Sequence, residues 1–215
     1  MSVLSCRGLG FKVRDAELLR DIHLDVAQGE TLGIVGPNGS GKSTFVTRLL
    51  QPVTHLPFVN ADVIAEERWP DAQAEHAYEA SAAAADERVQ LLTQQRSFIT
   101  ETVFSHRSKL DLVSDALSVG YLVHLHVVLV PVDVAVKRVA ERVRHGGHSV
   151  PEQKIRERYA RLWDLVARAR IAADRVDFLD NSSAAKPFRR VAAYERGLLI
   201  GAPTWPAWTP TALTA

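Results

Sequence analysis

A glycine-rich segment with a single lysine carries the clearest chemical signal in this chain. Residues 36–44 follow the spacing G-x-x-x-x-G-K-[ST], with an apolar run before them and a helical pattern after them. The glycines let successive backbone N–H groups point at a phosphate, Lys42 can reach the β- and γ-phosphates, and Ser43 can ligate Mg²⁺. We therefore predict that the chain binds ATP with Mg²⁺. The predicted nucleotide contacts in this loop are Gly36, Pro37, Asn38, Gly39, Ser40, Gly41, Lys42, Ser43 and Thr44.

Two acidic residues follow short apolar runs that have the pattern of strands. Asp62 comes after residues 57–61, and Glu101 comes after residues 97–100. Ligands of open α/β sheets bind beyond the carboxyl ends of the strands, so both acids are expected beside the phosphate loop. Asp62 is predicted to orient an acceptor hydroxyl and take its proton, with the N-cap of a helix starting near Val63 as the alternative. Glu101 is predicted to hold the magnesium hydration shell or bind the acceptor, and simple solvation at a strand end is the alternative.

Basic residues gather in the second half of the chain. Residues 131–170 contain ten Lys and Arg against five Asp and Glu. Arg138 and Arg142 share a helix face near the break at residues 146–147, and Arg156 and Arg158 fall early in the next helix. This layout predicts a helical lid around residues 138–158 that brings arginines to the γ-phosphate, with Arg142 as the catalytic candidate and Arg138 as a nucleotide contact. The alternative is a solvated basic face.

Further polar residues follow other predicted strands. Thr102 and His106 are candidates to line the acceptor pocket, with a surface loop as the alternative for His106. His124 and His126 share one face of a strand at a spacing that can bind zinc, but the sequence shows no third ligand for them. Buried or strand-end histidines are therefore the preferred interpretation.

The order of strand and helix patterns predicts an α/β fold with a mostly parallel sheet in a single domain. Its expected parts are a β extension over residues 1–30, a core over 31–183, and a hairpin and tail over 184–215. A long helix is expected to bury Tyr78, Ala82, Ala85, Val89 and Leu92. Ser149 and Glu152 have the spacing of a capping box that opens another helix. Residues 188–200 read as a hairpin turning at Gly197, and the aromatic tail is expected to dock on the body.

Composition excludes several classes of protein. The formal net charge of +1 argues against nucleic-acid or membrane binding through bulk charge. The longest apolar stretch, residues 125–131, is far shorter than the roughly 20 residues of a membrane-spanning helix. Cys6 is the single cysteine, so no intrachain disulfide can form, and nothing at the N-terminus resembles a cleavable signal. A cytoplasmic location is expected.

Two family resemblances meet at the phosphate loop. Residues 3–48, with Gly8-Leu9-Gly10-Phe11 and Gly29-Glu30-Thr31, resemble the start of an ABC-transporter ATPase, which would stack adenine near Phe11. Residues 44–183 resemble the zeta-toxin family of P-loop kinases, which includes UDP-N-acetylglucosamine kinases. The second resemblance rests on residues 58–62, 98–102, 146–151, 155–159 and 180–183. No LSGGQ signature or glutamine loop of the first family follows.

The zeta-toxin resemblance implies a kinase with ATP and Mg²⁺, a UDP-amino-sugar acceptor and an antitoxin protein as a partner. It also implies that Asn181 belongs to an adenine-contacting loop. Where zeta toxins carry Glu-Gly-Thr, this chain has Glu101-Thr102-Val103, so their threonine contact does not transfer. We hypothesise transfer of the γ-phosphate to the hydroxyl of a small molecule. The alternatives are an ABC-type or regulatory ATP-binding module and a nucleotide binder without activity.

Overall fold

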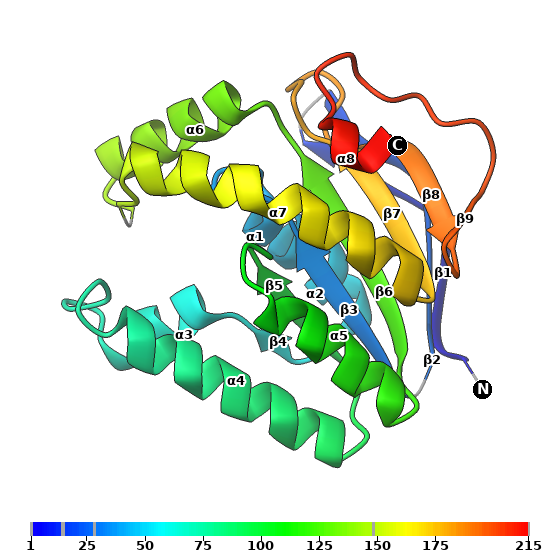
Figure 1. Ribbon diagram of the computed structural model, residues 1–215, viewed down its shortest axis with the longest axis horizontal. Helices are drawn as coiled ribbons and strands as arrows, with labels where there is room; N and C mark the ends of the chain where they lie inside the picture. The colour runs from blue at the N-terminus through cyan, green and yellow to red at the C-terminus, as the bar shows by residue number, and fades with distance from the viewer. Residues whose placement is uncertain (1, 14–15, 28, 148, 215) are drawn as a thin grey trace.

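A seven-stranded sheet forms the centre of the molecule (Figure 1). The computed structural model describes the backbone of residues 2–13, 16–27, 29–147 and 149–214, and side chains from residue 29 onward within these ranges. The strand order is β4 (Phe58–Val59), β5 (Phe98–Thr102), β3 (Glu30–Val35), β6 (Leu122–Leu129), β7 (Arg175–Asp180), β8 (Arg189–Glu195) and β9 (Leu198–Leu199). The first five run parallel, and the last two continue the sheet antiparallel. The predicted fold class, including its C-terminal hairpin, is confirmed.

Helices cover both faces of this sheet. A continuous helical stretch of α1 (Lys42–Phe45), one π-helical segment η1 (Val46–Leu50) and α2 (Gln51–Thr54) lies on one face. On the other face lie α5 (Ser108–Ser118), α7 (Glu152–Ala172) and the short α8 (Thr211–Thr214). Strand β6 separates the two cores because side chains alternate along a strand. Val123, Leu125 and Val127 join the α5–α7 core, whereas Val128 joins the α1 core.

Two helical pairs extend beyond the carboxyl ends of the strands. One consists of α6 (Val132–Arg144) with the first half of α7, and the other of α3 (Ala61–Arg68) with the start of α4 (Ala77–Thr93). Figure 1 shows these pairs on opposite sides of the edge where β3 and β5 end. The segment between β3 and α1 therefore lies where both pairs can approach a ligand.

The N-terminal residues form a separate antiparallel pair of strands. Strands β1 (Ser2–Val13) and β2 (Ala16–Ala27) pair with each other in a two-stranded sheet of their own. The alternating pattern before the loop thus does correspond to strands. The Phe11 side chain, expected to stack on adenine, lies outside the described side chains, and the division into extension, core and tail stays a prediction.

Helix α4 forms as expected but buries a different face. Tyr78 is 84% exposed and Val89 is 60% exposed, so most of the predicted stripe faces solvent, and of its residues Leu92 packs against the core. The buried positions are Ala80, Ala84, Arg88 and Leu91. Small alanines let α4 pack closely on α3 and β4, and that tertiary contact outweighs the pattern of larger apolar residues.

The expected capping box at Ser149 does not form. Helix α7 begins at Glu152 with Pro151 at the N-cap position, and no side chain caps it. Proline fixes its own φ and disfavours helical geometry in the residue before it, so the helix cannot extend back to Ser149. The glycine break that precedes it is present, because α6 ends at Arg144.

The C-terminal tail docks on the body as expected. Trp205 packs edge-on against Phe178 with ring centroids 5.0 Å apart, and Leu213 in α8 is fully buried. Arg170 of α7 donates a hydrogen bond to the Leu213 carbonyl at 2.8 Å. Within the described ranges, no helix is long and apolar enough to cross a membrane.

Candidate active site

The phosphate loop turns tightly between β3 and α1. Gly39 and Gly41 have φ angles of 74° and 93°, a region that side chains with a Cβ rarely adopt. A Cβ on Gly39 would lie 2.5 Å from the Ala135 carbonyl oxygen, and one on Gly41 would lie 2.6 Å from Asn181 Nδ2. Both glycines are therefore required by backbone conformation and by close packing against neighbouring elements.

Lys42 lies at the start of α1 with its ammonium group buried. Its Nζ donates to the Pro37 carbonyl at 3.0 Å and lies 3.6 Å from Glu101 Oε1. Burial lowers the pKa of Lys42, the charges of Glu101 and Asp62 oppose that shift, and Arg142 adds to it. A buried ammonium held by one carbonyl and one carboxylate can exchange both for phosphate oxygens.

Glu101 connects three elements at the carboxyl ends of the strands. Its Oε2 accepts hydrogen bonds from Ser43 Oγ at 2.8 Å and from Asn60 Nδ2 at 2.9 Å. Strand β5 lies between β4 and β3, so these side chains meet where the three strands end. The hydroxyl and carboxylate together offer the oxygen ligands that Mg²⁺ prefers. These two residues are the ones predicted to hold the metal.

We did not predict a role in the site for Asn60 from the sequence. Its Oδ1 accepts from the Asp62 backbone N–H at 2.8 Å and caps α3, while its Nδ2 binds Glu101. The interpretation of Asp62 as an N-cap is thus wrong, because Asp62 lies in the first turn of α3 and Asn60 caps it. An asparagine directly before a helix is a recognisable capping signal and could have identified the residue.

Asp62 and Arg142 both lie close enough to Lys42 to influence its pKa, which the Asp62 charge raises and the Arg142 charge lowers. They come from α3 and from the last turn of α6, on opposite sides of the loop. Arg142 is exposed, and its Cγ packs against Gly147, where a Cβ would lie 2.6 Å away. An acid and a guanidinium therefore flank the buried lysine, an arrangement that suits chemistry on a phosphoryl group.

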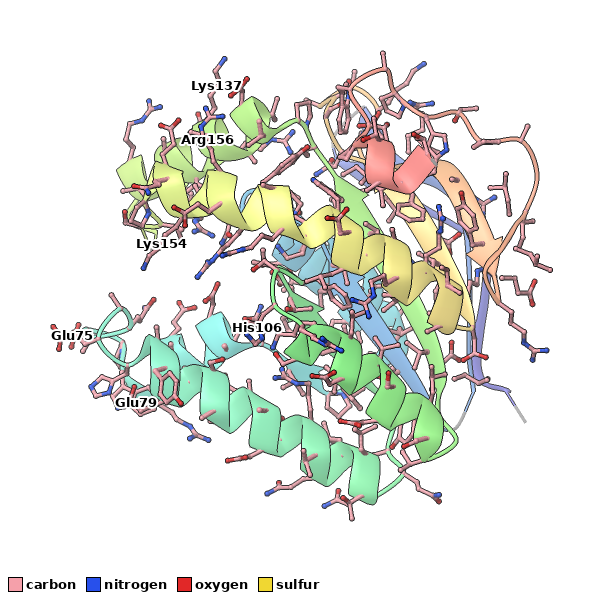
Figure 2. The ribbon with its side chains drawn as sticks, in the orientation of Figure 1. Glu75, Glu79, His106, Lys137, Lys154 and Arg156 are labelled. Carbon is pink, nitrogen blue, oxygen red and sulfur yellow. The ribbon has the colours of Figure 1, made fainter. Side chains whose placement is uncertain are left out.

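The remaining basic residues of α6 and α7 differ in their environments. Arg138 is half-buried, and burial lowers its pKa. Arg156 forms ion pairs of 2.8 Å with Asp133 and Glu152, and so ties α7 to α6. Figure 2 shows Arg156 between the two helices and Lys154 toward their tip. Arg156 thus links the two helices, and Arg142 lies within electrostatic range of Lys42.

Thr102 and His106 lie on the α5 side of the sheet. Thr102 Oγ1 accepts from the Phe104 N–H at 3.2 Å, and Thr102 lines a small cavity between the sheet and α5. His106 is exposed at the start of α5 (Figure 2), and its Nδ1 lies 3.0 Å from Ser108 Oγ. Neither contacts Glu101 in the described hydrogen bonds, so their predicted contact with an acceptor stays a prediction.

Asn181 lies against the phosphate loop from the end of β7. It is buried, and its Nδ2 donates to the Ser40 carbonyl at 2.7 Å. Its backbone N–H is bound to the Leu129 carbonyl at 2.9 Å. The side chain therefore supports the shape of the loop, and the expected contact with adenine stays a prediction.

Two buried polar atoms of the loop lack partners within the described part of the chain. They are Asn38 Oδ1 and Ser40 Oγ. An unpaired buried polar atom costs about 1–3 kcal/mol, so such atoms call for a ligand or water. With the positive-φ glycines, the lysine and the Ser43–Glu101 pair, they fit a nucleotide polyphosphate and its Mg²⁺.

The fold and this site define a P-loop nucleotide-binding domain of the kinase-like type. Residues 32–164 match the family described as AAA domain, which is more than half of the chain. The chain therefore belongs to this AAA domain family of P-loop proteins.

Several solved structures share the fold. The AvrRxo1-ORF1:-ORF2 complex with ATP has a TM-score of 0.65 at 17% identity, over 81% of this chain and 60% of that one. The PezAT chromosomal toxin–antitoxin system of Streptococcus pneumoniae has a TM-score of 0.55 at 12% identity, over 71% and 67%. Shikimate kinase from Acinetobacter baumannii, solved with shikimate, has a TM-score of 0.50 at 17% identity, over 73% and 86%. At these identities the likeness concerns the fold.

Short matches to transport ATPases also occur. The zinc import ATP-binding protein ZnuC of Ruegeria pomeroyi is 50% identical over 48 residues, 22% of this chain and 19% of that protein. The hemin import ATP-binding protein HmuV of Rhodopseudomonas palustris is 48% identical over 48 residues, 22% and 18% of the two chains. The matched segment thus spans about a fifth of the curated relatives.

Proposed function

We propose that this protein is a kinase that transfers the γ-phosphate of ATP to a hydroxyl group of a small molecule. The observation that carries the proposal is the set of charges around the phosphate loop: Lys42 is buried with Glu101 beside it and has both Asp62 and Arg142 within electrostatic range. An acid on a separate helix beside the phosphate loop can orient an acceptor hydroxyl and take its proton.

Each residue has a role that follows from its environment. Lys42 leaves the Pro37 carbonyl to bind phosphate oxygens, and Asp62 accepts the proton of the acceptor hydroxyl as that oxygen attacks. Arg142 contributes positive charge toward the transferred group, and Arg138 binds the nucleotide from the same helix. Ser43 and Glu101 would hold Mg²⁺, which would neutralise charge on the phosphates when bound.

Two cations beside β5, on the side of the sheet where Thr102 lies, support an anionic acceptor. Arg88 is buried and its NH1 lies 3.4 Å from Thr100 Oγ1, while Lys109 lines the cavity that Thr102 also lines. Burial lowers the pKa of Lys109, and the nearby Arg88 lowers it further. Neither has a salt bridge among the described residues. A phosphate-bearing acceptor such as a UDP-amino-sugar would supply the missing negative charge.

The fold also supports a protein partner for this kinase. The PezAT neighbour belongs to a toxin–antitoxin system, and the AvrRxo1 neighbour contains ORF1 together with ORF2. We propose, on this analogy, that an antitoxin-like protein binds this chain. We also propose a cytoplasmic location. Neither the partner nor the location depends on the catalytic proposal, so an experiment can contradict one of them and leave the others standing.

Substituting Asp62→Asn tests the catalytic proposal. The amide keeps the size of the side chain but cannot take a proton, so transfer of ³²P from γ-labelled ATP to UDP-N-acetylglucosamine should fall by about 10²–10⁴-fold. ATP binding, measured by isothermal titration calorimetry, should change little. Glu66→Gln, an exposed acid on the same helix, is the matched control and should retain activity.

The same assay distinguishes the alternatives. Label on no UDP-sugar, sugar or nucleoside would contradict the kinase proposal. ATP-dependent dimerisation with phosphate release and no labelled acceptor would instead favour a transport-type or regulatory ATPase module, the reading that the short matches to import ATPases support. Binding of ATP with neither reaction would leave a nucleotide binder without activity.

A further inference from the structure

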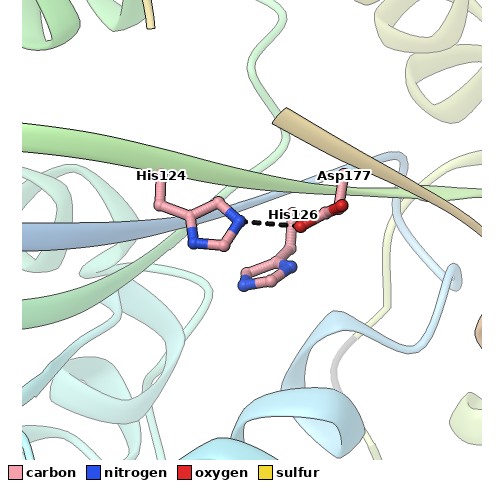
Figure 3. Close-up of side chains that lie close together, drawn as sticks. All are labelled: His124, His126 and Asp177. Carbon is pink, nitrogen blue, oxygen red and sulfur yellow. Dashed lines mark hydrogen bonds and ion pairs between the residues drawn. The ribbon is translucent and has the colours of Figure 1, made fainter. Parts of the chain in front are cut away.

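Three buried side chains with metal-ligating atoms meet on the α1 face of the sheet, away from Glu101 and Ser43. His124 and His126 come from β6, and Asp177 comes from the neighbouring strand β7 (Figure 3). The two histidines are two residues apart and so share a face, and Asp177 stands opposite His126 in the strand register. All three are at least 96% buried.

The distances within this cluster suit a shared ion. One candidate ligand atom from each residue lies within 4.8 Å of the other two, and His124 Nε2 lies 2.9 Å from Asp177 Oδ2. Two nitrogens on one tetrahedral zinc ion lie about 3.3 Å apart, given zinc–nitrogen bonds of about 2.0–2.1 Å. The side chains would need to move closer together around an ion, and β6 and β7 are neighbouring strands within the sheet.

His126 carries the observation that points to a ligand. Neither of its ring nitrogens has a hydrogen-bond partner in the described part of the chain, although the residue is 97% buried. A neutral imidazole offers a lone pair that can bind a metal ion. Buried histidines with a purely structural role normally satisfy at least one nitrogen.

Asp177 supplies the negative charge of the cluster. Its Oδ1 has no hydrogen bond, while Oδ2 accepts from His124 and from Arg175 Nε at 3.2 Å. Arg190 lies 3.8 Å from Oδ1. Both arginines are partly exposed and contact the carboxylate from the outside, as hydrogen-bonding and charged partners commonly orient a ligating carboxylate.

We propose that His124, His126 and Asp177 form a binding site for a divalent transition-metal ion, with Zn²⁺ as the expected occupant. Two imidazoles and one carboxylate are a ligand set that zinc accepts and that Mg²⁺ disfavours. The site is therefore chemically distinct from the oxygen site at Ser43 and Glu101, and it does not depend on the proposed kinase activity.

The location of the cluster links it to the phosphate loop. The Phe45 ring lies 5.3 Å from the His126 ring, and Phe45 ends the helix that begins with Lys42. A metal ion bound to His126 would hold its ring in place against Phe45 of α1. Occupancy should thus stiffen the contact between the central strand and the helix that carries the phosphate-binding lysine.

Metal binding to the full chain tests this proposal. Protein stripped with a chelator is titrated with Zn²⁺ in competition with a chromophoric chelator, and with Co²⁺ to read its coordination from visible absorption. Because the cluster is buried, metal is offered both to the folded chain and during refolding. We expect about one ion per chain, a Co²⁺ spectrum typical of nitrogen and oxygen ligands, and an increased midpoint of thermal unfolding.

His126→Leu separates metal binding from folding. Leucine removes two unpaired buried nitrogens, so the metal-free variant should unfold at the same temperature as the wild type or higher. Its zinc affinity should fall by more than about 100-fold, since even outer-shell changes cost about 10–100-fold. His145→Ala, at an exposed histidine directly after α6, is the control and should keep full affinity.

Two results would overturn the proposal. One is a wild-type chain that takes up neither Zn²⁺ nor Co²⁺ under either loading condition. The other is a His126→Leu variant that binds as tightly as the wild type, which would assign the metal to other residues. If the variant fails to fold, Asp177→Asn serves as the second ligand variant, with the same loss of affinity expected.

Discussion

Asn60 performs two tasks with one amide group. Its oxygen caps α3, and its nitrogen orients the Glu101 carboxylate toward Ser43. The helix that carries Asp62 and the residue expected to hold Mg²⁺ are therefore positioned by the same side chain. A carboxylate between a hydroxyl, an amide and an ammonium has little freedom to turn away, so the proposed metal ligand is preorganised.

Asn60→Ser is predicted to separate these tasks. Serine is as good an N-cap as asparagine, so the free energy of unfolding should change by less than about 1 kcal/mol. The contact with Glu101 is lost, and the Mg²⁺ concentration that gives half-maximal phosphoryl transfer should rise by about 10-fold. Asn60→Ala should add about 1 kcal/mol of destabilisation by removing the cap. Equal Mg²⁺ dependence in wild type and Asn60→Ser would contradict this role.

Helix α7 is held to the sheet by a polar contact as well as by its apolar face. The Tyr159 hydroxyl donates to the Val130 carbonyl at 3.0 Å, just beyond the end of β6. The Tyr159 ring also packs edge-on against Trp163, with centroids 5.1 Å apart. Because Val130 is fully buried, its carbonyl depends on this partner. This contact holds α7 to the sheet. Near the start of the same helix, Arg156 links α7 to α6 through Asp133.

The stability contribution of Tyr159 should be lost in alkali. Burial raises the pKa of Tyr159 to about 12 from its ordinary value of 10.0. The fold thus favours the neutral phenol, and its contribution is complete below about pH 10 and disappears as the pH rises through about 12. Tyr159→Phe should lower the free energy of unfolding by about 1 kcal/mol at pH 7 and by less near pH 12. Urea denaturation across this range measures it.

Tyr78→Phe is the matched control for that measurement. Tyr78 is 84% exposed on α4, so the same loss of a hydroxyl should leave stability unchanged at every pH. A Tyr159→Phe deficit that stays constant between pH 8 and 12 would show that the hydroxyl does not titrate in this window.

At the scale of the whole molecule, the C-terminal tail packs into the core and forms part of it. Trp205 and Trp208 pack against the larger apolar cluster, and Leu213 fills it from α8. Arg170 connects this tail to α7 through the Leu213 carbonyl and stacks over Tyr194 at 4.6 Å. The tail therefore braces α7 and the antiparallel strands.

Leu213→Ala is predicted to destabilise the protein strongly. The side chain is completely buried, so its loss should cost about 2–5 kcal/mol through lost burial and the cavity it leaves. Leu198→Ala, at a position 75% exposed, should cost less than about 0.5 kcal/mol. Chemical denaturation of both variants measures the difference. Similar values for the two would mean that the tail contributes little to folding stability.

Local patterns were sufficient for much of the fold. The phosphate loop, the strand before it and the helix after it are contiguous in sequence, so their spacing alone identified them. The order of strands and helices, the break before α7 and the turn at Gly197 are likewise short-range features. Helix α4 shows the limit, because its buried face depends on contacts with α3 and β4 that no local pattern contains.

The residues of the two sites likewise fall into those that a local motif identifies and those that only the packing of the sheet brings together. Lys42 and Ser43 could be identified from a nine-residue motif, since a phosphate loop works through consecutive backbone and side-chain groups. The contact of Asn60 with Glu101 joins residues 41 apart, and that of His124 with Asp177 joins residues 53 apart. Such pairs depend on which strands are neighbours and in what register. Sequence spacing specifies one face of one strand, whereas the packing of the sheet brings the third ligand to it.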